Sequence, residues 1–138
     1  MARLEAVLFD LDSTLLNTNC LRAFRESRDF SKITDEHIAN TKCYSQVPLL
    51  LRRLREAGVR TGIVTNSPRD YADKLIAHHG ISDVIDVVIT YNDVGPSGKK
   101  PSSKGIHIAL NALGITKLKR VAYVGDEYTD VIAAYRAG

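Results

Sequence analysis

The chain has 138 residues, of which 44% are hydrophobic, and this is the size and composition of one globular domain with a buried core. Its two cysteines, Cys20 and Cys43, are too few for a disulfide scaffold and lack the spacing of zinc ligands. We therefore expect a single domain over residues 1–138, with free thiols in a reducing compartment.

Charge and apolar patterning exclude further classes of protein. The net charge is +3 and the basic residues are spread along the chain, which is typical of a solvated surface. Aromatic residues make up 7% and do not cluster, so we expect no sequence-specific nucleic acid partner. No apolar run reaches the roughly 20 residues that cross a bilayer, and the N-terminus lacks a signal-peptide pattern. We expect a soluble, cytoplasmic protein without a membrane partner.

Short apolar, β-rich runs alternate with helical patterns. In chain order the sequence predicts a strand over residues 6–11, a helix over 48–57, a strand over 62–65, a helix over 68–79, a strand over 84–90, a helix over 103–113, a strand over 121–125 and a helix from about 129 onward. Strands that alternate with helices of this length indicate parallel βαβ units. The predicted fold is α/β, an open, doubly wound parallel sheet with helices on both faces.

Local signals define two of the helices in more detail. Before the second helix, Ser67 is the predicted N-cap, Pro68 takes the first helical position, and Asp70 completes the spacing of a capping box. The first helix carries a group of leucines that we expect in the core: Leu49, Leu50, Leu51 and Leu54.

Polar residues follow three of the four predicted strands at their carboxyl ends, where open parallel sheets bind ligands. They are Asp10 and Asp12 after the first strand, Thr65, Asn66 and Ser67 after the second, and Asp126, Glu127 and Asp130 after the fourth. Acidic groups gathered at one edge would repel one another unless a cation lay among them, so the pattern indicates a divalent metal. For both early aspartates to reach one site, the backbone must turn at residues 11–12.

Four segments in this order resemble the four motifs of the haloacid dehalogenase superfamily of phosphatases: FDLDSTL, VTNS, GKKPSSKGI and VGDEYTD. The first motif of that family, D-x-D-x-T, matches residues 10–14 without a mismatch, and the fourth, G-D-x-x-x-D, matches residues 125–130. The resemblance spans nearly the whole chain. Four motifs in the correct order are far more specific than any one of them.

The resemblance implies a role for each matching residue. Asp10 would be the nucleophile that takes the phosphoryl group, and Asp12 would be the acid and base for the leaving group and the attacking water. The family pattern implies Mg²⁺ held by the Asp10 side chain, the Asp12 carbonyl and the Asp126 side chain. Asp130, or alternatively Glu127, would not bind the metal itself but would orient the residues that do.

The second and third motifs imply phosphate contacts. Thr65 would donate a hydrogen bond to the phosphoryl oxygens, and Asn66 would bind phosphate beside it at the start of a helix. Lys100 matches the family's K-P pattern and would balance charge among the carboxylates and the phosphate, with Lys99 as the alternative.

These roles together predict a magnesium-dependent phosphomonoester hydrolase that works through an aspartyl-phosphate. Asp12 favours phosphate chemistry over dehalogenation, because an alkoxide leaving group needs a proton and a halide does not. The alternative is a noncatalytic binding or scaffold module of a larger assembly.

The chain differs from many members of the family in two places. Only residues 17–46 separate the first motif from the next core helix, so we expect a short insert in place of a cap domain and an open site. The substrate would be a phosphorylated macromolecule, or a small phosphorylated compound enclosed by loops or a neighbouring subunit. The ending AAYRAG lacks the strand that normally follows in the family, and an uncovered sheet edge would invite pairing into a homo-oligomer.

Overall fold

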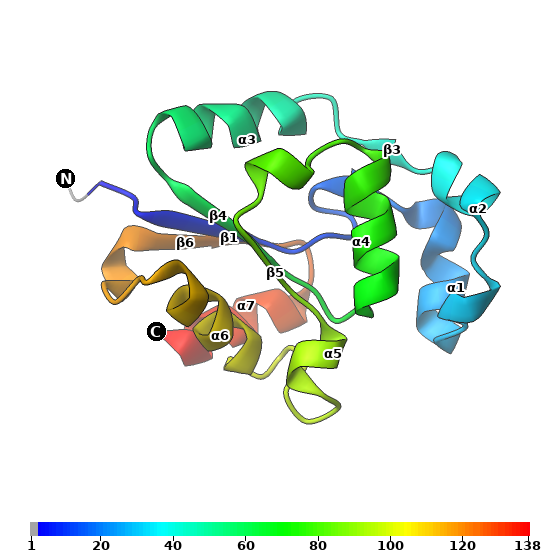
Figure 1. Cartoon of the computed structure of the whole chain (residues 1–138). Coiled ribbons are helices and arrows are strands. Elements are labelled where there is room, and N and C mark those ends of the chain that lie inside the picture. The colour runs from blue at the N-terminus through cyan, green and yellow to red at the C-terminus, as the bar shows by residue number, and fades with distance from the viewer. Residues whose placement is uncertain (1–2) are drawn as a thin grey trace.

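The structure, a computed structural model, describes residues 3–138 and contains a four-stranded parallel sheet (Figure 1). The strands are β1 (Ala6–Phe9), β4 (Arg60–Val64), β5 (Val87–Ile89) and β6 (Val121–Val124), in the order β5-β4-β1-β6. Ala6 aligns with Arg60 on one side and with Val121 on the other, which fixes the register of the three adjoining strands. All four predicted strands and their parallel pairing are confirmed.

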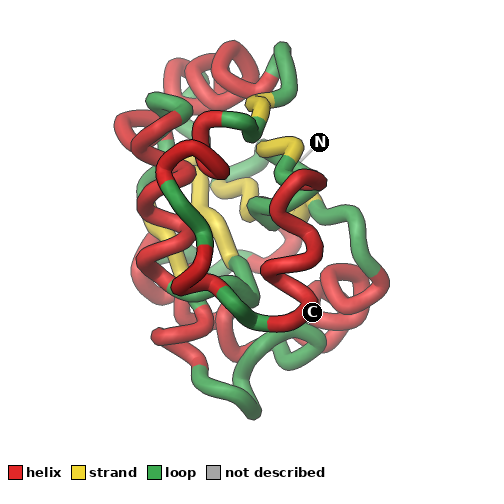
Figure 2. Tube along the Cα trace, turned by 90° about the vertical axis from the view of Figure 1, so that its right-hand side faces the viewer, coloured by secondary structure: helices red, strands yellow, loops and turns green. Residues whose placement is uncertain are grey.

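Helices cover both faces of the sheet, as Figures 1 and 2 show. Val7 and Phe9 of β1 belong to the core shared with α3 (Val47–Glu56) and α4 (Arg69–His78). Ala6 and Leu8 point to the opposite face and belong to the core shared with α6 (Lys104–Leu113) and α7 (Tyr128–Ala137). This alternation is the two-residue period of a strand buried on both sides. Within residues 3–138 the structure has no helix of the length and apolar character that a membrane crossing requires.

The strand order places a topological switch point between β1 and β6. From β1 the chain moves outward to β4 and β5, and it then crosses over to β6 on the other side of β1. Connections that leave in opposite directions open a crevice at the carboxyl ends of these two strands. The crevice lies where Asp10 follows β1 and Asp126 follows β6.

The insert that the sequence leaves unassigned contains short elements. They are β2 (Leu16–Asn17), a 3₁₀ turn at Asn19–Leu21, α1 (Arg22–Ser27), a 3₁₀ turn at Phe30–Lys32, α2 (Asp35–Ala39) and β3 (Lys42–Cys43). β2 and β3 form a small antiparallel pair that closes the insert at its base. Two further short elements, a 3₁₀ turn at Ser82–Val84 and α5 (Tyr91–Val94), flank β5, and a 3₁₀ turn at Leu118–Arg120 precedes β6.

Two local predictions are wrong. Pro68, not Ser67, is the N-cap of α4, and no side chain caps this helix, because the Ser67 hydroxyl donates to Asp12 instead. In α3, Leu51 is fully buried, whereas Leu49 and Leu50 are 52% and 44% exposed. Consecutive leucines cannot all face one side of a helix with 3.6 residues per turn.

β6 lies at one edge of the sheet, and the apolar side chains near it include Val124 and, on α7, Tyr128, Val131 and Tyr135, which are all exposed. The expected pairing of this edge with another copy of the chain stays a prediction.

Gly62 lets β4 pack between its two neighbouring strands. A Cβ atom at this position would lie 2.8 Å from the Leu8 Cδ2 and 2.8 Å from the Val87 Cγ1. We expect Gly62→Ala to lower the free energy of unfolding by about 1–3 kcal/mol, because the added methyl group overpacks the core. Urea denaturation measures the change. The double variant Gly62→Ala/Val87→Ala should recover part of the loss, and additive effects of the two substitutions would contradict this explanation.

Candidate active site

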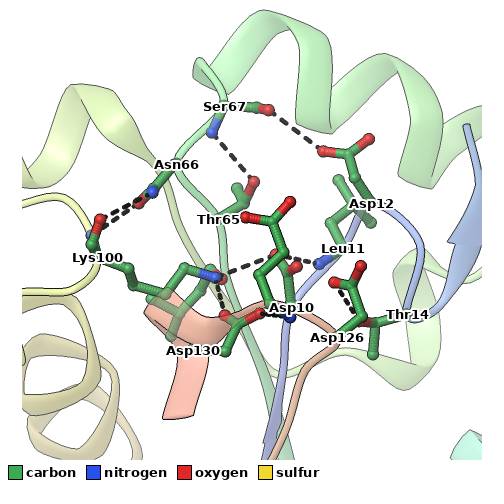
Figure 3. Close-up of polar contacts among 12 residues, drawn as sticks. Asp10, Leu11, Asp12, Thr14, Thr65, Asn66, Ser67, Lys100, Asp126 and Asp130 are labelled. Carbon is green, nitrogen blue, oxygen red and sulfur yellow. Dashed lines mark hydrogen bonds and ion pairs between the residues drawn. The ribbon is translucent and has the colours of Figure 1, made fainter. Parts of the chain in front are cut away.

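The Asp10 side chain is fixed at the end of β1 by two donors. The backbone N–H of Asp10 still donates to the Val124 carbonyl across the sheet, at 2.9 Å, and the strand ends at the preceding residue. Asp10 Oδ1 accepts from the Leu11 N–H at 2.8 Å and from the Lys100 Nζ at 3.0 Å (Figure 3). Because both contacts fall on Oδ1, Oδ2 is the oxygen left to react.

After Asp10 the backbone turns, as the sequence predicts. The amides of Thr14, Leu15 and Leu16 all donate to the Leu11 carbonyl. Ser13 adopts a left-handed conformation with φ 62°, and its N–H donates to the Leu16 carbonyl at 2.8 Å. This tight turn directs the Asp12 side chain away from Asp10 and towards Ser67 (Figure 3).

Lys100 is buried among four oxygen atoms from different parts of the fold. Its Nζ lies 2.6 Å from Asp130 Oδ1, 2.8 Å from the Val64 carbonyl, 3.0 Å from Asp10 Oδ1 and 3.0 Å from the Tyr123 hydroxyl. The neighbouring Lys99 is exposed. Of the two lysines that the sequence leaves open, the structure therefore brings Lys100 to the carboxylates.

The side chain of Asn66, which the sequence predicts to bind phosphate, forms hydrogen bonds with the main chain of Lys100 instead. Asn66 Oδ1 accepts from the Lys100 N–H at 2.8 Å, and Asn66 Nδ2 donates to the Lys100 carbonyl at 3.1 Å. The amide group thus positions the lysine. Thr65 is buried beside it, and its Oγ1 accepts from the Ser67 N–H at 3.1 Å. The proton of the Thr65 hydroxyl therefore remains available for another acceptor.

The Asp10 carboxyl group titrates far from its ordinary range. Burial is the largest cause and raises its pKa from 3.8 to about 7, the charge of Asp130 adds to this, and Lys100 opposes it. A carboxyl group that loses its hydration without full compensation holds its proton more strongly. A cation beside Asp10 would favour the ionised form.

Asp10, Asp126 and Asp130 form a group that fits a divalent cation. One ligand oxygen from each lies within 4.8 Å of the others. Within residues 3–138, Lys100 is the only cation paired with Asp10 and Asp130, and no ion pair includes the exposed Asp126. Three carboxylates against one ammonium group leave two negative charges, and hard oxygen donors are the ligands that Mg²⁺ prefers. The Asp12 side chain is not part of this group.

Gly125 allows Asp130 to approach the end of β6. A Cβ atom at Gly125 would lie 2.4 Å from the Asp130 Cγ, so only glycine fits without displacing the carboxylate. Glu127 is the N-cap of α7, and its N–H donates to Asp130 Oδ2 at 3.1 Å. Asp130 is therefore held by the first turn of its own helix and by Lys100.

A cavity of about 190 Å³ connects these residues with the insert. Asp10, Asp12, Thr65 and Lys100 line it from the core, and Arg25, Glu26, Arg28 and Phe30 line it from the insert. The Arg28 guanidinium lies 5.0 Å from the ring centre of Phe30, within the insert, and 4.6 Å from that of Tyr91 in α5, so one cation–π contact joins the insert to the core.

The sequence does not reveal the residues that surround the Asp12 carboxylate. Tyr71 and Thr18 each donate to Asp12 Oδ1 at 2.6 Å, and Arg25 Nη1 lies 3.5 Å from the same atom. Burial, followed by the charge of Asp12, raises the pKa of Tyr71, so its hydroxyl stays protonated as a donor. No motif contains these residues, because they lie in the insert and inside a helix, at positions that a local pattern assigns to packing.

Comparisons with known proteins show the family of the chain. The family model of the haloacid dehalogenase-like hydrolases matches residues 21–138. Pyrophosphatase PpaX of Bacillus velezensis is 30% identical over 177 aligned residues, which cover 99% of this chain and 81% of that protein. Phosphoglycolate phosphatase of Yersinia pestis is 31% identical over 112 residues, which cover 78% of this chain and 47% of that protein. The chain belongs to the haloacid dehalogenase-like hydrolases.

Solved structures show the same fold. A HAD phosphatase from Thermococcus onnurineus superposes with a TM-score of 0.81 at 24% identity, over 98% of this chain and 83% of that one. A HAD-superfamily hydrolase from Geobacter sulfurreducens superposes with a TM-score of 0.81 at 17% identity, over 99% of this chain and 86% of that one. The α/β architecture predicted from the sequence is confirmed.

The raised pKa of Asp10 predicts a pH-dependent stability of the metal-free protein. Between about pH 4 and pH 7 the folded chain keeps the Asp10 proton while the unfolded chain has lost it, so the free energy of unfolding should fall as the pH rises through this window. Thermal unfolding in EDTA, compared with Asp10→Asn at each pH, isolates this contribution. A constant difference between the two proteins from pH 4 to pH 7 would contradict the prediction.

Replacing Lys100 should destabilise the fold far more than replacing Lys99. Lys100→Met leaves two buried carboxylates without their cation, and we expect a loss of about 3–5 kcal/mol in the free energy of unfolding of the metal-free protein. Lys99→Met removes an exposed charge one residue earlier and serves as the matched control. Equal urea midpoints for the two variants would show that Lys100 does not balance the buried charge.

Proposed function

We propose that the protein is a magnesium-dependent phosphomonoester hydrolase in which Asp10 is the nucleophile and Asp12 the general acid and base. The observation that carries the proposal is the placement of these two carboxylates in one cavity, with Asp10 beside Lys100 and Asp12 among hydroxyl donors. Membership of the hydrolase family and relatives named as phosphatases support it.

In the first step Asp10 Oδ2 attacks phosphorus, and the bond from phosphorus to the leaving oxygen breaks. Asp12 gives its proton to that oxygen, so the leaving group departs as an alcohol and Asp10 carries the phosphoryl group as an aspartyl-phosphate. The Thr65 hydroxyl, whose oxygen already accepts from Ser67, donates its free proton to a phosphoryl oxygen.

In the second step water attacks the phosphorus of the aspartyl-phosphate. Asp12, now ionised, takes a proton from this water, and the bond from phosphorus to the Asp10 oxygen breaks. Inorganic phosphate and the free Asp10 carboxylate result, and Asp12 is again protonated for the next leaving group. Lys100 keeps the charge of the returning carboxylate balanced throughout.

Mg²⁺ would be held by the Asp10 and Asp126 side chains and the Asp12 carbonyl, and it would supply the positive charge that lets a carboxylate approach a phosphate dianion. Asp130 contributes through its ion pair with Lys100 and its bond to the Glu127 N–H, which keep the acidic group in place. Glu127, the alternative residue for this orienting role, is the N-cap of α7 and lines the same cavity.

The substrate that the cavity suits best is a small phosphorylated compound. Its volume of about 190 Å³ takes a phosphoryl group with a small leaving group, and Arg25, Arg28 and Phe30 of the insert line it. The alignment with the B. velezensis pyrophosphatase spans 177 positions, whereas this chain has 138 residues, so that relative contains residues that this chain lacks. Pyrophosphate and phosphoglycolate, from the names of relatives, are the first candidates to assay.

The proposal predicts that the protein releases phosphate from an aryl phosphate only when Mg²⁺ is present. A panel of further substrates, which includes pyrophosphate and phosphoglycolate, would then be assayed in the same way. Asp10→Asn should lower kcat by more than about 1000-fold, because the amide cannot form the aspartyl-phosphate. Asp83→Asn, at an exposed aspartate outside the cavity, is the matched control.

Turnover that survives Asp10→Asn, or that is unaffected by EDTA, would reject the mechanism. A protein that binds Mg²⁺ and a phosphate analogue in calorimetry but releases no phosphate from any substrate would instead support the noncatalytic binding module.

A further inference from the structure

The Asp12 carboxylate is bound by three hydroxyl groups from separate parts of the chain. Oδ1 accepts from the Thr18 Oγ1 and from the Tyr71 hydroxyl, both at 2.6 Å, and Oδ2 accepts from the Ser67 Oγ at 3.2 Å. At 2.6 Å, the bonds from Thr18 and Tyr71 have the length of strong, charge-assisted hydrogen bonds, whereas the bond from Ser67 is longer. Both oxygens of Asp12 are thus held in one orientation.

Arg25 directs the protons of two of these hydroxyls. Its Nη1 donates to the Thr18 carbonyl at 2.8 Å and to the Thr18 Oγ1 at 2.9 Å, and it lies 3.4 Å from the Tyr71 hydroxyl oxygen. A hydroxyl has a single proton, so a hydroxyl oxygen that accepts from Arg25 turns its own proton to Asp12. Such a chain of donors strengthens each bond in it and carries the positive charge of Arg25 towards Asp12.

The insert supplies two of the four groups around Asp12, and the core supplies Ser67 and Tyr71. Thr18 and Arg25 belong to it, and its Phe30 packs edge-on against the Tyr71 ring with the ring centres 5.2 Å apart. The side chains of Arg25 and Asp12 are only 16% and 13% exposed, so water competes little for these contacts. An acid that must meet a leaving oxygen depends on such fixed placement, since an error of about 1 Å can cost about 100-fold in rate.

We propose that Arg25, from the insert at residues 17–46, and Tyr71, from α4 of the core, are positioning residues that hold the Asp12 carboxylate for proton transfer. The inference rests on the proposed role of Asp12 in the hydrolase. Neither residue touches the phosphoryl group in this scheme; each acts through Asp12.

The kinetic test compares two leaving groups. An aryl oxide departs without a proton, whereas an alkyl oxide needs the proton from Asp12. We expect Tyr71→Phe and Arg25→Gln to lower kcat/KM for an alkyl phosphate by about tenfold and to change kcat/KM for an aryl phosphate much less. Arg22→Gln, at an exposed arginine on the same helix, is the matched control. An equal fall on both substrates, or no fall on either, would overturn the proposal.

A second measurement does not depend on turnover. Crystal structures of the wild type, Tyr71→Phe and Arg25→Gln should show the Asp12 carboxylate displaced or in several orientations in both variants. An unmoved carboxylate in both would overturn the positioning role, even if the enzyme is active. If the wild type hydrolyses neither phosphate, the proposed function fails, and the crystal structures still decide whether Arg25 and Tyr71 hold Asp12.

Discussion

The ammonium group of Lys100 is the contact on which the arrangement of the site depends. It meets the Val64 carbonyl at the end of β4, Asp10 after β1, Tyr123 in β6 and Asp130 in α7. Burying an ammonium group and two carboxylates is costly unless each finds a partner, and here all three do. One side chain therefore joins the carboxyl ends of three strands and fixes where the reactive carboxylate lies.

The pairing of charges divides the site into two regions. On the side of β6, Asp126 and Asp130 meet Asp10 and leave a surplus of negative charge that suits a divalent cation. On the side of α4, Asp12 is surrounded by neutral hydroxyls and one guanidinium group, which hold its carboxylate in one orientation. The turn at Ser13 separates the two regions, because it sends two carboxylates only two residues apart to opposite sides of one cavity.

The insert completes the region around Asp12 with few residues. A larger cap domain would enclose a substrate with its own core, whereas here α2 of the insert packs against α4, and the insert residues that line the cavity are Arg25, Glu26, Arg28 and Phe30. Phe30 and Arg28 stabilise the insert against the core through aromatic and cation–π contacts. The same contacts that hold the insert on the core therefore also bring Thr18 and Arg25 to Asp12.

The sequence alone determined the order of strands and helices and the carboxylates at the strand ends, because apolar periodicity and the four motifs are local patterns. It could not choose between Lys99 and Lys100, since which of two adjacent lysines is buried depends on the path of a loop held by Asn66. It misplaced the Ser67 hydroxyl, whose partner lies 55 residues away, and it missed Arg25 and Tyr71. Only the tertiary structure decided the choice of lysine, the partner of Ser67 and the contacts of Arg25 and Tyr71. The physical reason is that hydrogen bonds between residues far apart in the chain produce no local or periodic pattern in the sequence.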